Sequence, residues 1–208
     1  MTKVTIRPVE ERDFTFMHDT LYKTWFEDEH DNEELAYALA EIDLNQFLNR
    51  GTFGLVAEAA GEAVGFILAK VNKEEPVLRQ LQSDPYEPLI TILNAPAELQ
   101  KENGEYLKRE KEVNSGMVEE SETSFDAEIC LFIVNPSTRG MGIGQRLFGK
   151  VKEHFESQDV EDYYLFTDDG CDYKFYEKQQ MHRSQSRPLD KLDRLEESSF
   201  NFYLYENN

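Results

Sequence analysis

The N-terminal part of the chain changes from the period of a strand to that of a helix. Residues 5–7 predict a short strand that Pro8 ends, and Asp13 follows as the expected N-cap of a helix. The apolar residues of this helix lie on roughly one face and are Phe14, Met17, Leu21 and Trp25. A second helix is predicted between Asn32 and Gly51, where apolar positions again recur near helical spacing.

Two apolar runs then predict a β-hairpin. They cover residues 52–59 and 63–71 and are joined by the turn-like Ala60-Gly61-Glu62. The order breaks at residues 72–125, which are rich in charge, contain several prolines and predict a helix only around residues 97–113. We interpret this segment as an insertion in a single domain that spans residues 1–208.

After the insertion, strands and helices alternate again. The predicted order is a strand at 127–134, a helix at 143–158, a strand at 162–167, a helix at 171–180 and a last strand at 200–205. The polar stretch at 184–199 before the last strand predicts a loop. Alternating strands and helices indicate an α/β fold.

Charge and composition limit the partners. The chain has 42 acidic and 22 basic side chains, for a formal net charge of −20. This charge repels phosphates, so we expect neither nucleic acid nor membrane as a partner. No apolar run resembles a signal peptide or a membrane span, which predicts a cytoplasmic protein. The two cysteines, Cys130 and Cys171, are not in a ligand-spaced cluster, and no metal site is predicted.

The most informative segment is a glycine-rich turn between the strand at 127–134 and the helix at 143–158. It reads Val134-Asn-Pro-Ser-Thr-Arg-Gly-Met-Gly-Ile-Gly144. Glycines without Cβ atoms let backbone N–H groups approach an anion closely, and the N-terminus of a helix favours negative charge. The turn is therefore a candidate diphosphate cradle, although tightening a strand-to-helix connection is the simpler alternative.

The glycine spacing separates the known kinds of cradle. A dinucleotide fingerprint requires G-x-G-x-x-G, and a nucleotide P-loop requires a lysine and a hydroxyl that this turn lacks. The pattern Arg139-x-x-Gly142-x-Gly144, with Val134-x-Pro136 upstream, resembles the acetyl-CoA signature R/Q-x-x-G-x-G/A of the GNAT superfamily of N-acetyltransferases. The resemblance covers most of the chain except residues 72–125.

This resemblance implies a fold and a co-substrate. The fold is α/β (α+β), with a GNAT-type mixed, mostly antiparallel central sheet whose fourth and fifth strands splay apart, flanked by helices. Acetyl-CoA is the implied co-substrate, with no metal. Its pantetheine arm would pair with the backbone of Phe132, Ile133 and Val134. Its pyrophosphate would lie against the backbone of Arg139, Gly140, Met141, Gly142, Ile143 and Gly144.

Two catalytic residues are implied as well. Phe175-Tyr176-Glu177-Lys178 matches a second family motif, whose tyrosine donates a proton to the departing thiolate, so Tyr176 is the expected acid. The family motif continues with Gly-Phe where this chain has Gln180-Met181. Glu128, at the start of the fourth strand, is the expected general base, with Asp168 and Asp169 as the next candidates.

The implied activity is transfer of an acetyl group to a primary amine by direct attack. The alternative is a catalytically weak module that binds or senses an acyl-CoA on the same fold. The acceptor is a small-molecule or peptide amine, and polyamine, aminoglycoside, amino acid and protein lysine stay open. For residues 72–125 we expect an ordered flap near the acceptor, with a homodimer contact or a disordered linker as alternatives.

Overall fold

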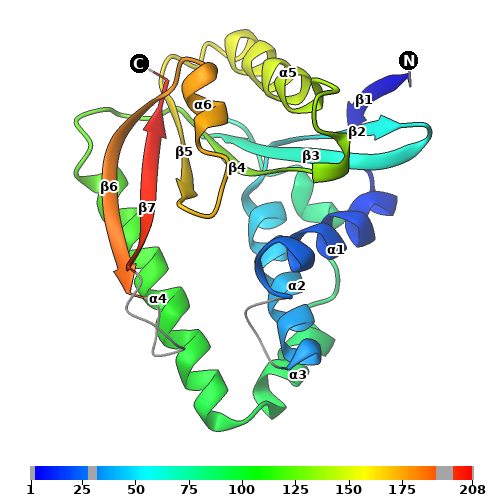
Figure 1. The fold of residues 1–208 in the computed structure, drawn as a ribbon, viewed down its shortest axis with the longest axis vertical. Helices are drawn as coiled ribbons and strands as arrows, with labels where there is room; N and C mark the ends of the chain where they lie inside the picture. Colours follow the sequence, from blue (N-terminus) through cyan, green and yellow to red (C-terminus); the bar gives the residue numbers. More distant parts are fainter. Residues whose placement is uncertain (1–2, 28–31, 191–198, 208) are drawn as a thin grey trace. The chain divides into compact units, whose positions relative to one another are not determined.

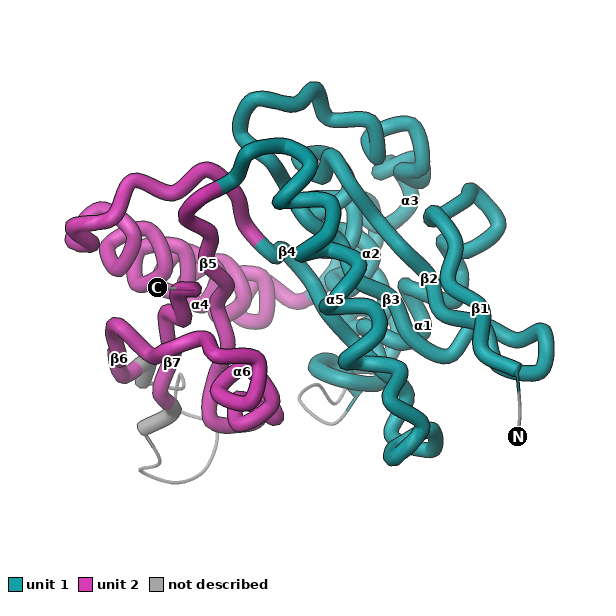
Figure 2. Tube along the Cα trace, turned by 90° about the horizontal axis from the view of Figure 1, so that it is seen from above, with its two compact units in different colours: residues 1–95, 129–160 teal, residues 96–128, 161–208 magenta. Residues whose placement is uncertain are grey.

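The computed structural model describes residues 3–27, 32–190 and 199–207. It divides into two compact units (Figure 2): unit 1 comprises residues 1–95 and 129–160, and unit 2 comprises residues 96–128 and 161–208. The strand order is β1-β2-β3-β4 in unit 1 and β5-β7-β6 in unit 2. The neighbours β1/β2, β2/β3, β5/β7 and β6/β7 are all antiparallel. The predicted α/β fold with a mostly antiparallel sheet flanked by helices is confirmed.

The elements follow one another as Figure 1 shows. The first half contains β1 (Val4–Pro8), η1 (Glu11–Asp13), α1 (Phe14–Trp25), α2 (Glu33–Arg50), β2 (Phe53–Ala59), β3 (Glu62–Val71), η2 (Leu78–Leu81) and α3 (Tyr86–Asn94). The second half contains α4 (Ala97–Glu119), β4 (Ala127–Val134), η3 (Pro136–Thr138), α5 (Ile143–Ser157), β5 (Tyr163–Asp168), α6 (Lys174–Lys178), β6 (His182–Asp190) and β7 (Ser199–Glu206).

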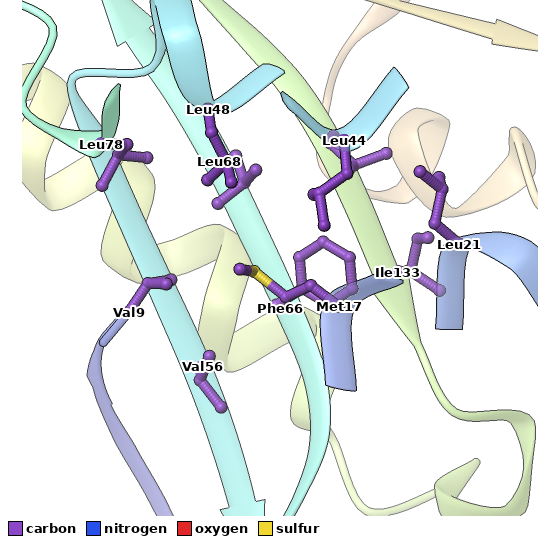
Figure 3. Packing of buried hydrophobic residues seen from close by; sticks show 11 residues of the cluster. Val9, Met17, Leu21, Leu44, Leu48, Val56, Phe66, Leu68, Leu78 and Ile133 are labelled. Carbon is purple, nitrogen blue, oxygen red and sulfur yellow. The ribbon is translucent and has the colours of Figure 1, made fainter. Parts of the chain in front are cut away.

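In unit 1, helices cover both faces of the sheet. The helices α1 and α2 pack on one face, and α5 packs on the other against β2 and β3 (Figure 1). The core on the α1/α2 side gathers apolar side chains from both helices and from three strands, with Phe66 of β3 at its centre (Figure 3). Because alternate residues of a strand point to opposite faces, Phe66 and Leu68 share this core. Burying each such side chain contributes about 1.5–3 kcal/mol.

In unit 2, α4 and α6 lie on opposite faces of the β5-β7-β6 sheet. Met117 of α4 packs against Phe202 and Leu204 of β7. The intervening Tyr203 and Tyr205 instead contact tyrosine rings at α6, at centroid distances of 5.6 and 5.9 Å. Alternation along one strand therefore divides the unit into an apolar α4 face and a tyrosine-rich α6 face.

Docking of α4 onto β6 depends on close backbone contact. The side-chain amide of Gln185 donates to the carbonyl of Met117 at 2.5 Å, and Arg187 pairs with Glu120. A Cβ atom at Gly116 would lie 2.7 Å from Nη1 of Arg187, so a residue without a side chain lets Arg187 cross the helix.

Several boundaries differ from the sequence prediction. Residues 184–190 were predicted as loop but form most of β6, which pairs with β7 over its whole length. Polar residues can form this strand because its ladder bonds come from the distant β7. Residues 191–198 of the same predicted loop lie outside the described residues. The helix predicted around 97–113 extends to Glu119, and the helix predicted at 171–180 is only Lys174–Lys178.

The segment predicted as an insertion is ordered and is shared between the two units. Its first part, η2 and α3, packs on α2 in unit 1, and its second part, α4, packs on β6 and β7 in unit 2. The alternative of a disordered linker is therefore wrong, because these helices find apolar and polar partners within each unit. Whether the segment contacts an acceptor or another subunit stays a prediction.

The short helix α6 ends in a Schellman motif. The N–H of Met181 donates to the carbonyl of Tyr176 at 3.1 Å, and the N–H of Gln180 donates to the carbonyl of Glu177 at 3.1 Å. This pair of bonds places Gln180 in the left-handed region, with φ of 68°. The family motif has glycine at this position, so the chain keeps the geometry of the motif with a residue that disfavours it.

Replacing Gln180 with glycine should stabilise the protein. The left-handed conformation costs a residue with a Cβ atom about 1–2 kcal/mol, and glycine avoids this cost. Glycine also loses more conformational entropy on folding, which offsets roughly 0.5–1 kcal/mol of the stabilisation. We expect Gln180→Gly to raise the free energy of unfolding in urea by about 0.5–1 kcal/mol. Gln179→Gly is the matched control, because its φ of −86° needs no glycine and the substitution should destabilise. Equal effects of both variants would refute the strain at Gln180.

Candidate active site

The residues predicted to bind the cofactor form one continuous segment of unit 1, from the end of β4 through η3 to the start of α5. Asn135 shapes this turn. Its backbone N–H donates to the carbonyl of Val64 in β3 at 2.8 Å, and its side-chain oxygen accepts the N–H of Ser137 at 3.0 Å. The carbonyl of Asn135 also accepts the N–H and the hydroxyl of Thr138 at 3.0 and 2.8 Å. The sequence prediction overlooked Asn135, although Asn before Pro is a typical turn signal.

The two glycines at the centre of the turn are required by the backbone. Gly140 has φ of 83°, and Gly142, the N-cap of α5, has φ of 69°. Both values lie in the left-handed region that residues with a Cβ atom disfavour. A Cβ atom at either glycine would meet no heavy atom of the described residues within 4 Å. The surface of the turn is therefore open at these positions.

The start of α5 presents backbone donors that the described part of the chain leaves unpaired. The first intrahelical bond runs from the N–H of Arg146 to the carbonyl of Gly142 at 3.1 Å. The N–H groups of Ile143, Gly144 and Gln145 therefore have no helical acceptor, and no other described group accepts from them. Because the helix dipole adds positive potential at the same end, this site favours an anion.

Basic side chains reinforce this potential. Arg139 and Arg146 lie next to these donors, whereas Lys150, further along α5, forms an ion pair with Glu153. Arg139 is exposed and forms no ion pair with any described residue. Arg146 is exposed and donates to the carbonyl of Val4 at 3.2 Å. The turn is thus a local basic site on an acidic protein.

The residues predicted to bind the pantetheine arm are the last three of β4. Ile133 is buried in the core, and Phe132 faces the other side, with its ring 6.4 Å from that of Phe148 in α5. A Cβ atom at Gly65 of β3 would lie 3.0 Å from the carbonyl oxygen of Ile133 and 3.1 Å from Cα of Val134. The glycine at position 65 therefore allows β3 to approach this part of β4.

Tyr176 lies on α6 in unit 2 and is half-buried. Its ring is 5.5 Å from that of Phe175 and 5.9 Å from that of Tyr205. Burial raises the pKa of its phenol well above the ordinary value, and Cys171, Asp168 and Asp172 raise it further. The phenol is therefore protonated at neutral pH.

Glu128 lies on the first part of β4, which belongs to unit 2. Its side chain is only 4% exposed, and Oε2 accepts the hydroxyl hydrogen of Tyr164 at 3.2 Å. Tyr164 belongs to the apolar cluster on the α4 face, with its ring 4.7 Å from that of Phe125. The two predicted catalytic residues thus contact opposite faces of the sheet in unit 2.

The alternative carboxylates differ in their environments. Burial raises the pKa of Asp168, whose Oδ1 accepts the N–H of Gly170 at 2.7 Å. Asp169 accepts hydrogen bonds from Tyr203 and from the backbone and side chain of Asn201, and these bonds lower its pKa. Neither caps α6, whose N-cap is Tyr173. Asp169 is engaged in holding β7.

Cys171 had no role in the sequence prediction, and the structure places it beside Asp168. Burial and the adjacent Asp168 raise the pKa of its thiol to about 11, so it is a neutral thiol at physiological pH.

No group of His, Cys, Asp and Glu side chains within the described ranges could hold a metal ion. Within the same ranges, no helix is long and apolar enough to cross a membrane.

The comparisons with known proteins identify the family of the chain. The sequence model of the Acetyltransferase (GNAT) family matches residues 14–180. No curated protein sequence is similar enough to the chain to count as a relative.

Solved structures share the fold at low identity. Ard1 from Thermoplasma volcanium has a TM-score of 0.55 at 18% identity, over 98% of this chain and 95% of that one. The ribosomal-protein-S18-alanine N-acetyltransferase from Escherichia coli has a TM-score of 0.55 at 12% identity, over 98% of this chain and 92% of that one. Arabidopsis thaliana Naa50, in complex with the bisubstrate analogue CoA-Ac-MVNAL, has a TM-score of 0.52 at 15% identity, over 99% of this chain and 98% of that one. Since the family match covers most of the sequence, the chain belongs to the GNAT family of acetyltransferases.

Proposed function

We propose that the protein transfers the acetyl group of acetyl-CoA to a primary amine. The observation that carries the proposal is the row of unpaired N–H groups at the start of α5, behind a left-handed glycine turn with basic side chains. This arrangement suits a diphosphate that is bound through backbone atoms. Family membership and the complex of Naa50 with a CoA-containing analogue support acetyl-CoA as the co-substrate.

In this proposal the segment from β4 to α5 holds the cofactor. The backbone of Arg139, Gly140, Met141, Gly142, Ile143 and Gly144 binds the pyrophosphate, and Arg139 adds its guanidinium. The backbone of Phe132, Ile133 and Val134 pairs with the pantetheine arm as an added strand would. An N–H of this strand polarises the thioester carbonyl and stabilises the oxyanion that forms when the amine attacks.

Glu128 and Tyr176 handle the two proton transfers. An ammonium must lose a proton before its nitrogen attacks, and the buried carboxylate of Glu128 accepts it. Tyr176 donates its phenolic proton to the departing thiolate.

The acceptor is a primary amine of a small molecule or a peptide. Two similar structures support a peptide: one carries the name of a ribosomal-protein-S18-alanine N-acetyltransferase, and the other holds a CoA–peptide analogue. The net charge of −20 favours approach of a cationic amine.

An assay of thiol release tests the function. The protein is incubated with acetyl-CoA and, in turn, a polyamine, an aminoglycoside, an amino acid, a lysine peptide and a peptide with a free N-terminus. We expect release of free CoA thiol that depends on at least one of these amines. Calorimetric titration with CoA is run in parallel. Binding without amine-dependent thiol release would contradict the proposal and identify an acyl-CoA-binding module instead.

Substitution of Gly142 tests the cradle. Gly142→Val places a branched side chain in the open space of the turn and disturbs the donors at the start of α5. Losing a charge-assisted hydrogen bond costs about 1.5–3 kcal/mol, so the dissociation constant for CoA should rise roughly 10- to 100-fold.

Gly61→Val is the matched control for this prediction. Gly61 has φ of 88° in the hairpin turn, and its Cβ would also meet nothing within 4 Å. The control therefore carries the same kind of backbone strain away from the cradle and should bind CoA like the parent. If Gly142→Val also binds like the parent, the cradle is misplaced.

Removal of the Tyr176 hydroxyl tests the acid. Tyr176→Phe should retain fold and CoA affinity but lower kcat by about 10² to 10⁴, because only the proton donor is lost. Tyr86→Phe removes the hydroxyl of an exposed tyrosine in unit 1 and should leave kcat near that of the parent. An unchanged kcat for Tyr176→Phe with the best acceptor would assign Tyr176 to packing alone.

A further inference from the structure

Arg183 of β6 is surrounded by tyrosine rings on the α6 face of unit 2. Its guanidinium carbon lies 3.6 Å from the ring centroid of Tyr203, 4.8 Å from that of Tyr173 and 5.6 Å from that of Tyr205. Its Nε and Nη2 also donate to the hydroxyl oxygen of Tyr205 at 3.3 and 3.2 Å. A planar guanidinium can stack on a ring and donate in its own plane at once, which an ammonium cannot do.

The network around Arg183 reaches α6 at both of its ends. The ring of Tyr173, the N-cap residue, packs on that of Tyr203 at 5.6 Å. The hydroxyl of Tyr205, which accepts from Arg183, donates to Oε1 of Glu177 at 3.1 Å. Tyr176 lies between these two anchors, with its ring 5.9 Å from that of Tyr205.

A β-bulge aims Arg183 at this face. In the β6/β7 register Arg183 pairs with Tyr205, whereas Gln185 pairs with Leu204 and Arg187 with Phe202. Ser184 is the extra residue at this register shift. In a regular strand without this register shift, Arg183 would lie on the same face as Gln185 and Arg187, which contact α4. The bulge therefore turns one arginine of β6 toward α6 and leaves the other on α4.

The helix needs such an anchor. α6 has only 5 residues, and a helix of this length is not stable by its own hydrogen bonds. It also ends at Gln180, in the left-handed conformation that the family motif assigns to glycine. Contacts with the β6/β7 hairpin must then fix its position.

We propose that Arg183 is a positioning residue that, through Tyr203, Tyr205 and the bulge at Ser184, holds α6 so that the Tyr176 hydroxyl is correctly placed. This inference rests on the proposed function for its kinetic consequence. Its structural consequence, a fixed environment for the Tyr176 phenol, does not depend on activity.

The kinetic test uses Arg183→Met and Arg183→Lys. Both lack the planar guanidinium, and a small displacement of a catalytic group lowers the rate steeply, so kcat should fall by about tenfold or more while CoA affinity stays within about twofold. Arg187→Met is the matched control, because Arg187 lies on the same strand but contacts α4. Its kcat should equal that of the parent. An equal loss for Arg187→Met, or no loss for either Arg183 variant, would overturn the proposal.

The structural test is a phenol titration followed by absorbance. The difference between each protein and its Tyr176→Phe counterpart isolates the ionisation of Tyr176. If Arg183 holds α6, the pKa of Tyr176 in Arg183→Met should fall toward the ordinary value of about 10, because the phenol becomes solvated. Arg187→Met should titrate like the parent.

This titration separates the two ideas. A parent protein without thiol release would refute the proposed function, while the titration would still decide the role of Arg183. Tyr205→Phe provides a milder variant if Arg183→Met does not fold. It keeps the ring but removes the link between Arg183 and Glu177, and it should shift the Tyr176 titration in the same direction. An unchanged titration in every folded variant would overturn the proposal.

Discussion

The unpaired N–H groups at the start of α5 are the constraint around which unit 1 is organised. Every helix leaves its first amides without acceptors, and a protein must expose them or provide partners. Here the left-handed Gly140 and Gly142 and the turn bonds of Asn135 hold them open to the surface. The buried face of α5, with Ile143, Leu147, Val151 and Phe155, fixes the helix on the sheet and so fixes the direction of these donors.

The α6 region of unit 2 depends on a different principle. Its helix is too short to be stable alone, and its position is set by side chains from the β6/β7 hairpin. One arginine, three tyrosines and two carboxylates connect the helix to the hairpin through ring stacking and hydrogen bonds. The backbone forms the proposed anion site in unit 1, whereas side-chain networks determine the environment of Tyr176.

The helices of the segment between β3 and β4 pack in different units. α3 adds to the helical layer of unit 1, next to α2, where Ser83 donates to Glu41 and accepts from Asn45. α4 instead covers the apolar face of the sheet in unit 2, where Glu128 meets Tyr164. The same helix therefore borders the environment of the proposed base.

The sequence alone determined the local features. The strand at 127–134, the turn with Gly140 and Gly142 and the start of the helix at Ile143 follow from apolar period and glycine conformation, which depend on neighbours along the chain. The tertiary structure decided what depends on distant partners. The polar β6 exists because β7 pairs with it, and Arg183 faces α6 because of a register shift between these strands. No local pattern encodes either feature, since each is set by pairing between residues far apart in the sequence.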